Sequence, residues 1–267
     1  MQNVDWVVFL LKLVLVPIFI GVVSLAGQRW GSTVSGWLIG LPFTSGPVAF
    51  FLALEEGVVF ASKASVGIML GIMSSIVFCL VYSRSAMRHG WFQSALAGFT
   101  GFFVSTYLLD TITLPMLIGF ALALLVLATC FSLMPHVGSG RVSSGSMRWE
   151  LPARMVSATA LVFVVTGLAQ ALGPLLTGLL TPFPTYATTL AVFTHRSQGG
   201  EEAVKLLRGV VAGSLTFVFF FLIVSLTIVP WGIAASFLTA IGASFLTHAI
   251  SLQLLRFRDR NSESISL

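Results

Sequence analysis

The sequence predicts an all-α integral membrane protein with about nine transmembrane helices, arranged as two inverted-topology repeats of four helices around one linker helix. Three observations lead to this prediction: the composition, an internal repeat and the one-sided distribution of basic residues. Apolar residues make up 57% of the chain and charged residues only 9%, whereas soluble domains carry about 25% charged residues. Short stretches of alternating polarity, which membrane β-strands require, are absent, so the apolar segments are predicted to be helices.

The internal repeat covers most of the chain. Residues 12–80 align with residues 154–222 without a gap, at an offset of 142, with 17 identities in 69 positions. Repeated membrane-spanning segments indicate two related helical bundles. Among the matched pairs are Lys12 with Arg154, Gln28 with Gln170, Gly31 with Gly173, Gly36 with Gly178, Pro42 with Pro184, Phe51 with Phe193, Gly57 with Gly199, Lys63 with Lys205, Gly67 with Gly209 and Gly71 with Gly213.

The apolar segments divide the chain into four parts, because a membrane span needs about 20 mostly apolar residues. The first repeat, residues 1–110, contains predicted spans 5–27, 31–54, 64–83 and 91–109. Residues 111–150 contain the linker span 111–133 and a polar cytoplasmic loop. The second repeat, residues 151–255, contains spans 151–171, 173–195, 206–229 and 232–255, and residues 256–267 form a cytoplasmic tail.

Basic residues fix the expected orientation. Nine crossings place twelve lysines and arginines on one side and two on the other. The richer side is expected to be cytoplasmic, with the N-terminus outside and the C-terminus inside a plasma membrane, such as a bacterial inner membrane. The twelve are Arg29, Arg84, Arg88, Arg141, Arg148, Arg154, Arg196, Lys205, Arg208, Arg256, Arg258 and Arg260, and the two are Lys12 and Lys63.

The same count predicts that the second repeat is inverted, because five crossings separate the starts of spans 5–27 and 151–171. A competing topology treats 31–54 and 173–195 as re-entrant loops. It largely removes the charge asymmetry, so nine crossings are favoured.

The second helix of each repeat is predicted to be broken. Residues 40–47 (GLPFTSGP) interrupt span 31–54, and residues 181–186 (TPFPTY) interrupt span 173–195. Proline removes a backbone donor inside a helix, and freed backbone groups must face protein or water rather than lipid. Each restarted half-helix presents free N–H groups and a partial positive charge, which suit an anionic or polar ligand. The alternative is that the prolines only kink the helices and shape packing.

The candidate substrate-binding residues follow from these breaks and from one charge inside a span. Lys12 lies about seven residues into span 5–27, and a charged residue at that depth suggests a functional role. The alternative is that its long side chain extends to the interface. The predicted set is Lys12, Pro42, Thr44, Ser45, Gly46, Pro184, Thr185 and Tyr186.

Four other polar residues are candidates for gating or ion coupling: Glu56, His195, Gln198 and His248. Glu56 and Gln198 occupy matched positions at the ends of the broken spans, where the alternative is a solvated loop. His248 lies inside span 232–255 and can change charge near neutral pH, although a hydrogen-bonded structural histidine is the alternative. The matched Gly67-x-x-x-Gly71 and Gly209-x-x-x-Gly213 motifs predict close helix packing, against the broken spans or against each other.

These features predict a secondary transporter that moves a small polar or anionic solute by alternating access around the two breaks. The alternatives are a lipid flippase or scramblase that binds a phosphate headgroup, and a non-catalytic membrane subunit. We expect no enzymatic activity, cofactor or metal, because the sequence lacks a Walker loop and a His-Glu-x-x-His motif. The expected partners are a small-molecule or lipid substrate and membrane lipids, with no nucleic acid. The sequence is also compatible with a homo-oligomer.

Overall fold

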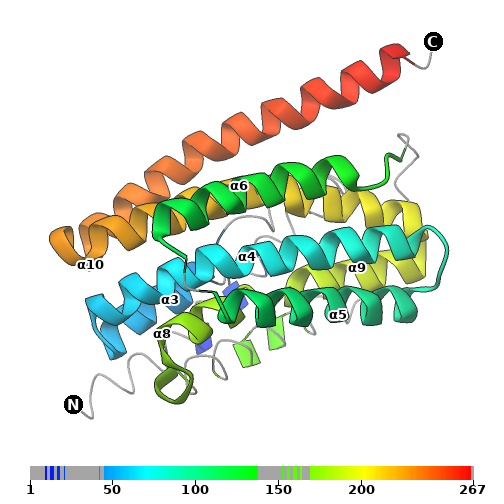
Figure 1. The fold of residues 1–267 in the computed structure, drawn as a ribbon. Coiled ribbons are helices and arrows are strands. Elements are labelled where there is room, and N and C mark those ends of the chain that lie inside the picture. The colour runs from blue at the N-terminus through cyan, green and yellow to red at the C-terminus, as the bar shows by residue number, and fades with distance from the viewer. Residues whose placement is uncertain are drawn as a thin grey trace.

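The chain folds into a bundle of long helices in a computed structural model (Figure 1). The structure describes residue 42 and residues 45–112, 114–137 and 169–265, with isolated positions between 10 and 21 and between 152 and 163. For residues 169–170, 185–186 and 248–265 it describes the backbone only. Most of the predicted spans 5–27 and 151–171, and the first part of span 31–54, therefore lie outside the described residues. The described part of the chain contains seven helices and no strand.

The described helices follow the order of the predicted spans. Helix α3 covers the second half of the predicted span 31–54, and α8 and α9 are the two halves of span 173–195. Helix α10 combines the last two predicted spans. The bounds are α3 Ser45–Glu55, α4 Val58–Ala86, α5 Trp91–Asp110, α6 Met116–Leu133, α8 Ala169–Leu180, α9 Thr185–Gln198 and α10 Gly200–Ile265.

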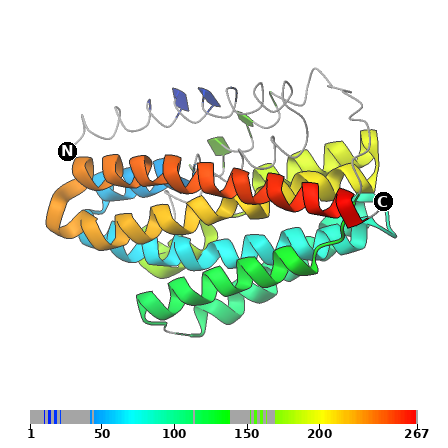
Figure 2. The same ribbon diagram turned by 90° about the horizontal axis from the view of Figure 1, so that it is seen from above.

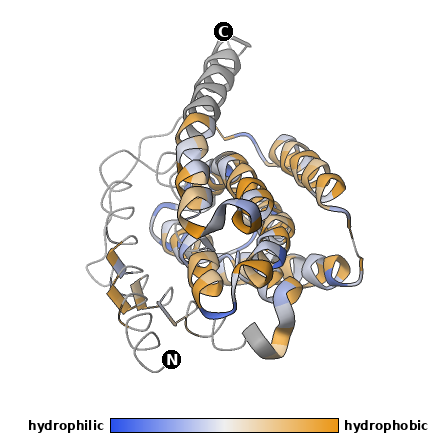
Figure 3. Cartoon of the chain, turned by 90° about the vertical axis from the view of Figure 1, so that its left-hand side faces the viewer, coloured by the Kyte–Doolittle hydropathy of each residue, from blue (hydrophilic) through white to orange (hydrophobic). Residues whose placement is uncertain are grey.

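The protein is membrane-embedded by the length and composition of its helices. Four helical segments in the described part are long and apolar enough to cross a membrane: Val58–Ala86, Trp91–Asp110, Met116–Leu133 and Gly200–Thr247. Viewed along the bundle, hydrophobic residues predominate on the outer helices (Figure 3). Large apolar side chains exposed on α5, α6 and α10 suit contact with lipid tails rather than water. They include Leu96, Phe103, Leu117, Leu125, Leu238 and Phe245.

Two matched glycines make the helix junctions shorter than predicted. Gly57 (φ 90°) joins α3 to α4, and Gly199 (φ 94°) joins α9 to α10. Glycine adopts this left-handed region at little cost, so at each of the two junctions the chain turns within one or two residues. Helices α4 and α10 therefore begin at Val58 and Gly200, six residues before the predicted spans 64–83 and 206–229. Lys63, expected in the connection before span 64–83, lies on α4, and Lys205 lies near the start of α10.

A third glycine divides α10 into two parts. Gly232 has a non-helical backbone (φ 76°, ψ 177°) and follows Pro230, so the chain reverses between Gly200–Trp231 and the segment that starts at Ile233. We call Gly200–Trp231 the first part of α10. The second part remains helical to Ile265, so it extends past the predicted end of span 232–255 and through most of the predicted tail.

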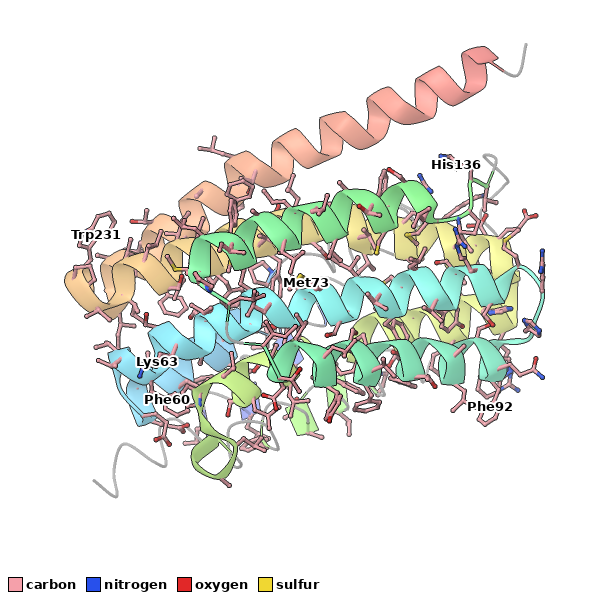
Figure 4. All side chains as sticks on the ribbon, viewed as in Figure 1. Phe60, Lys63, Met73, Phe92, His136 and Trp231 are labelled. Carbon is pink, nitrogen blue, oxygen red and sulfur yellow. The ribbon has the colours of Figure 1, made fainter. Side chains whose placement is uncertain are left out.

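Helix α4 lies at the centre of the bundle and packs against the first part of α10 (Figures 1 and 2). The two helices run in opposite directions. Lys63, near the start of α4, and Trp231, at the end of the first part of α10, lie at the same end of the bundle, whereas Phe92 and His136 lie at the other (Figure 4). Arg84 and Arg208 also lie at the second end, which we call the basic end. A hydrogen bond from Ser62 Oγ to the Ser225 carbonyl (2.8 Å) joins the two helices.

Two arginines hold the C-terminal end of α6 at the basic end. Arg84 of α4 donates from Nε and Nη2 to the Leu133 carbonyl at 3.2 and 3.1 Å. Arg208 of α10 donates to the carbonyls of Met134 (3.1 Å) and Pro135 (3.3 Å). The last carbonyls of a helix lack intrahelical donors and carry partial negative charge. Helix α6 is therefore attached to both α4 and α10.

We expect the double substitution Arg84→Ala, Arg208→Ala to destabilise the protein by about 1–3 kcal/mol, because hydrogen bonds from charged donors are lost. Thermal unfolding in detergent measures this effect. Arg88→Ala is the matched control, since Arg88 is an exposed arginine at the same end of α4. An equal loss of stability in the control would show that charge at this end matters, and not the contacts with α6.

Candidate functional site

The break in the second repeat is a four-residue turn between two half-helices. Helix α8 ends at Leu180 and α9 begins at Thr185. The turn is closed by a bond from the Phe183 N–H to the Leu180 carbonyl (3.0 Å), and the Thr188 N–H bonds the Pro184 carbonyl (2.8 Å). The chain therefore restarts as a helix directly after Pro184. The first N–H groups of α9 have no carbonyl of their own helix to bond.

In the first repeat a helix begins just after the matched proline. Pro42 is non-helical and α3 begins at Ser45. The Gly46 N–H bonds the Pro42 carbonyl at 2.8 Å, as Thr188 bonds Pro184. Pro42 and Pro184, and Gly46 and Thr188, are pairs at the offset of 142. The two half-helices thus begin in the same way at equivalent positions.

The turn at 181–184 is held by helices of the first repeat. Ser75 of α4 donates its hydroxyl to the Pro182 carbonyl. The ring of Phe183 stacks on Phe99 of α5, with a centroid distance of 5.6 Å and an interplanar angle of 11°. It also meets Phe102 edge-on at 5.2 Å. One polar bond and one aromatic cluster therefore fix the direction in which α9 begins.

The start of α3 rests on a helix of the second repeat. A Cβ atom at Gly46 would lie 3.7 Å from Cζ of Phe220 in α10. Phe50 meets Phe237, in the second part of α10, edge-on at 5.5 Å. The starts of α3 and α9 are thus each supported by aromatic side chains from the other half of the chain.

Buried hydroxyls without hydrogen-bond partners occur in the helices that form the breaks. Ser45 Oγ in the first turn of α3 and Thr188 Oγ1 in the first turn of α9 have no partner among the described residues. Ser45 is 1% exposed. An unsatisfied buried hydroxyl is costly and calls for an explanation. A polar ligand that bonds these groups is one such explanation.

The predicted substrate-binding residues fall at these two helix starts. Pro42, Ser45 and Gly46 lie together at the start of α3, and Pro184 is buried directly before α9. Thr185 and Tyr186 form the first turn of α9, described by backbone only. Lys12 and Thr44 lie outside the described residues.

The predicted gating residues are spread over the helix ends. Glu56 lies between α3 and α4. His195 and Gln198 lie in the last turn of α9, where His195 Nδ1 is 3.3 Å from the Tyr82 hydroxyl and Gln198 Oε1 is buried without a partner. His248 is on α10, with only its backbone described.

Ser75, Phe183 and Tyr82 were missed by the sequence analysis. Ser75 aligns with Phe217 and Tyr82 with Val224, so the repeat did not mark either of them. Phe183 lies inside the predicted break, but nothing in the neighbouring sequence indicates its contacts with Phe99 and Phe102. Within the described residues no group of three or more histidines, cysteines or carboxylates could hold a metal ion.

Neither a scan against protein-family models nor searches of curated proteins and of solved structures found a match to this chain. The described part therefore defines a class rather than a family: an all-helical, membrane-embedded protein with two helix starts at matched prolines.

Proposed function

We propose that the protein is a secondary transporter for a small anionic or polar solute, with its binding site at the two helix breaks and alternating access between the two sides of the membrane. The observation that carries this proposal is the matched start of α3 and α9 after Pro42 and Pro184, inside an apolar bundle. Broken helices at equivalent positions of two repeats are the usual site-forming elements of such transporters.

Three structural features support an inverted repeat as the basis of this function. Gly57 and Gly199 adopt the same left-handed conformation at matched positions. The helices that follow them, α4 and the first part of α10, run in opposite directions (Figure 4). The chain also turns at Gly90 and at Gly232, again a matched pair. Two inverted copies of one fold provide two related arrangements, one open to each side.

The chemistry of the helix starts favours an anionic or strongly accepting group. A helix N-terminus offers N–H donors and a partial positive charge. Ser45 Oγ and Thr188 Oγ1 add buried hydroxyls without described partners at these two starts. A carboxylate, phosphate or carbonyl group would satisfy both kinds of donor. On this proposal the basic end is cytoplasmic, since the described basic residues other than Lys63 lie toward it.

The test is a melting-temperature screen of the purified protein against carboxylates, phosphates, amino acids and lipid headgroup analogues, followed by uptake of any stabilising compound into proteoliposomes. A compound present at a hundred times its Kd stabilises the fold by about 2.7 kcal/mol. We expect Pro42→Ala with Pro184→Ala to weaken binding at least tenfold, about 1.4 kcal/mol, and to abolish uptake, because the helices can then continue through the breaks.

Pro230→Ala is the control for this variant. Pro230 is an exposed proline in α10 beside the bend at Gly232 and belongs to neither break. Wild-type uptake by the double proline variant would refute the site. Stabilisation by phosphate headgroup analogues alone, with accelerated dithionite quenching of fluorescent lipids, would assign lipid movement in place of solute transport.

A further inference from the structure

The basic end contains a polar contact between the two repeats. Tyr82 of α4 and His195 of α9 meet at 3.3 Å between the hydroxyl oxygen and Nδ1, with their rings edge-on at 6.0 Å. Tyr82 is fully buried and His195 is half-buried. Beside them the start of α10 is pressed against the end of α4, because a Cβ atom at Gly200 would overlap the Ala86 carbonyl. Helices α4, α9 and α10 therefore close this end of the bundle.

The opposite end has no such contact at the matched positions. Tyr82 aligns with Val224 and His195 with Ala53, and both of those residues are buried and apolar. Glu202, 7% exposed near the start of α10, aligns with Phe60. The two ends of an otherwise repeated structure thus differ in titratable side chains. At the basic end Tyr82, His195 and Glu202 stand where the opposite end has Val224, Ala53 and Phe60.

The charged groups on the helices packed against His195 are already paired or exposed, and His89 and His136 lie beyond the ends of α4 and α6. On α10, Glu202 and Lys205 form an ion pair at 2.6 Å. On α4, Arg84 donates to the Leu133 carbonyl. On α9 itself, Arg196 is exposed. Helix α8 contains no titratable side chain, and those of α5, Tyr107 and Asp110, lie in its last four residues, at the other end of the bundle.

Protonation changes what this contact can do. Neutral histidine accepts a hydrogen bond at Nδ1 from the Tyr82 hydroxyl, with its proton on Nε2. When both ring nitrogens carry protons, Nδ1–H donates instead, so the contact persists only if the Tyr82 hydroxyl turns to accept and its own buried proton loses its acceptor. A cationic ring in a closed, largely apolar contact also needs water or a counter-charge. Both effects favour separation of α9 from α4 and entry of water.

We propose that Tyr82 and His195 form a proton-operated gate at the basic end, closed when His195 is neutral and opened when it binds a proton. The gate rests on the proposed transport function and names the coupling ion: one proton, taken up at His195, for each opening of this side. The opposite end has Val224 and Ala53 in the equivalent places, so this pair of side chains cannot act there.

The test uses single cysteines in a Cys79→Ser, Cys130→Ser background. Ser83→Cys reports on the basic end, because Ser83 is fully buried beside Tyr82. Ser225→Cys is its matched counterpart at the other end. Maleimide labelling rates are measured in detergent at about pH 5.5 and pH 8.5, on either side of the usual histidine pKa of about 6.5. Each rate is divided by that of the same cysteine with His195→Gln, which removes the intrinsic pH dependence of the thiol.

For Ser83→Cys we expect this ratio to rise at least fivefold from pH 8.5 to pH 5.5, and for Ser225→Cys we expect no change. Tyr82→Phe lacks the donor, so its Ser83→Cys labelling is expected to be fast at both pH values. An unchanging Ser83→Cys ratio would overturn the gate, as would an equal rise at Ser225→Cys. Labelling requires no substrate, so it tests the gate separately from the uptake experiment. Either proposal can therefore be refuted while the other stands.

Discussion

Replacing Gly178 with alanine is expected to destabilise the protein by about 3 kcal/mol or more, since overpacking at a site that cannot relax lies at the upper end of its usual cost. A Cβ atom there would overlap the Ala64 carbonyl and lie 2.7 Å from Cα of Gly67 and 2.8 Å from N of Ile68. These are backbone atoms of α4, so no rotamer change relieves the contact. The helices α4 and α8 would have to move apart along their whole interface.

The reciprocal changes on α4 are expected to have the same sign. A Cβ atom at Gly71 would lie 2.5 Å from the Leu179 carbonyl oxygen, and one at Gly67 would lie 2.6 Å from that of Leu175. Gly242→Ala is the matched control, because that glycine is on a helix with nothing within 4 Å of the added atom. Alanine favours helix by up to about 1 kcal/mol over glycine, so the control should keep or raise the melting temperature.

Melting temperature and monodispersity in detergent measure both outcomes. If Gly178→Ala melted like the wild type, the close approach of α4 to α8 would be wrong, and the support of the break at 181–184 would need another source. If Gly242→Ala lost as much stability as Gly178→Ala, the loss would reflect a general sensitivity to glycine replacement in this bundle.

The glycine interface also marks how far the sequence alone could lead. The motif Gly67-x-x-x-Gly71 predicted close packing, because its spacing places two small residues on one helix face. It left open whether the partner was a broken span or the matched motif. The structure assigns α8, the first half of the broken span 173–195. Gly178, the residue that completes the contact, was visible only as the repeat partner of Gly36.

Helix ends were predicted less well than helix cores, for a physical reason. The predicted spans ended where apolar runs ended, as lipid contact requires. Glycine at positive φ lets a helix begin at once, so α4 starts at Val58, just after the polar Glu55 and Glu56, and α10 starts at Gly200, directly before Glu201 and Glu202. The apolar content of a segment indicates which part of a helix contacts lipid. The full length of the helix also depends on the backbone conformation at the junction, which apolar content does not report.

In the candidate site, too, residues that act locally were predicted and residues that act through distant partners were not. Pro42 and Pro184 were predicted because proline acts on its own backbone, which a sequence displays directly. Ser75 and Phe183 act through residues that are 107 or 84 positions away in the chain, Pro182 and Phe99. Such partners are set by how helices pack, so neither spacing nor the repeat could identify them.

Ser75 provides the second test with a large expected effect. Its hydroxyl bonds the Pro182 carbonyl in a buried position. Ser75→Ala leaves that carbonyl without its donor, at an expected cost of about 1–3 kcal/mol. We also expect faster hydrogen exchange at residues 183–187, because the start of α9 loses its polar attachment to α4. Thermal unfolding and hydrogen-exchange mass spectrometry measure the two effects.

The neighbouring serine is a close control. Ser74 is as deeply buried on the same helix, yet its hydroxyl has no described partner. Ser74→Ala removes an unsatisfied group, so stability should stay the same or rise, and exchange at 183–187 should not change. Ser75→Thr keeps the hydroxyl and should restore slow exchange, even if its extra methyl group costs some stability.

The two serines together separate positioning of the break from simple packing. If the volume of the hydroxyl group mattered most, Ser74→Ala and Ser75→Ala would lower stability alike and leave exchange unchanged. If Ser75 holds the break, only Ser75→Ala accelerates exchange, and the effect is confined to the start of α9. A solute that binds the N–H groups of that first turn should then lose affinity in Ser75→Ala and keep it in Ser74→Ala, because only the former frees the half-helix to change direction.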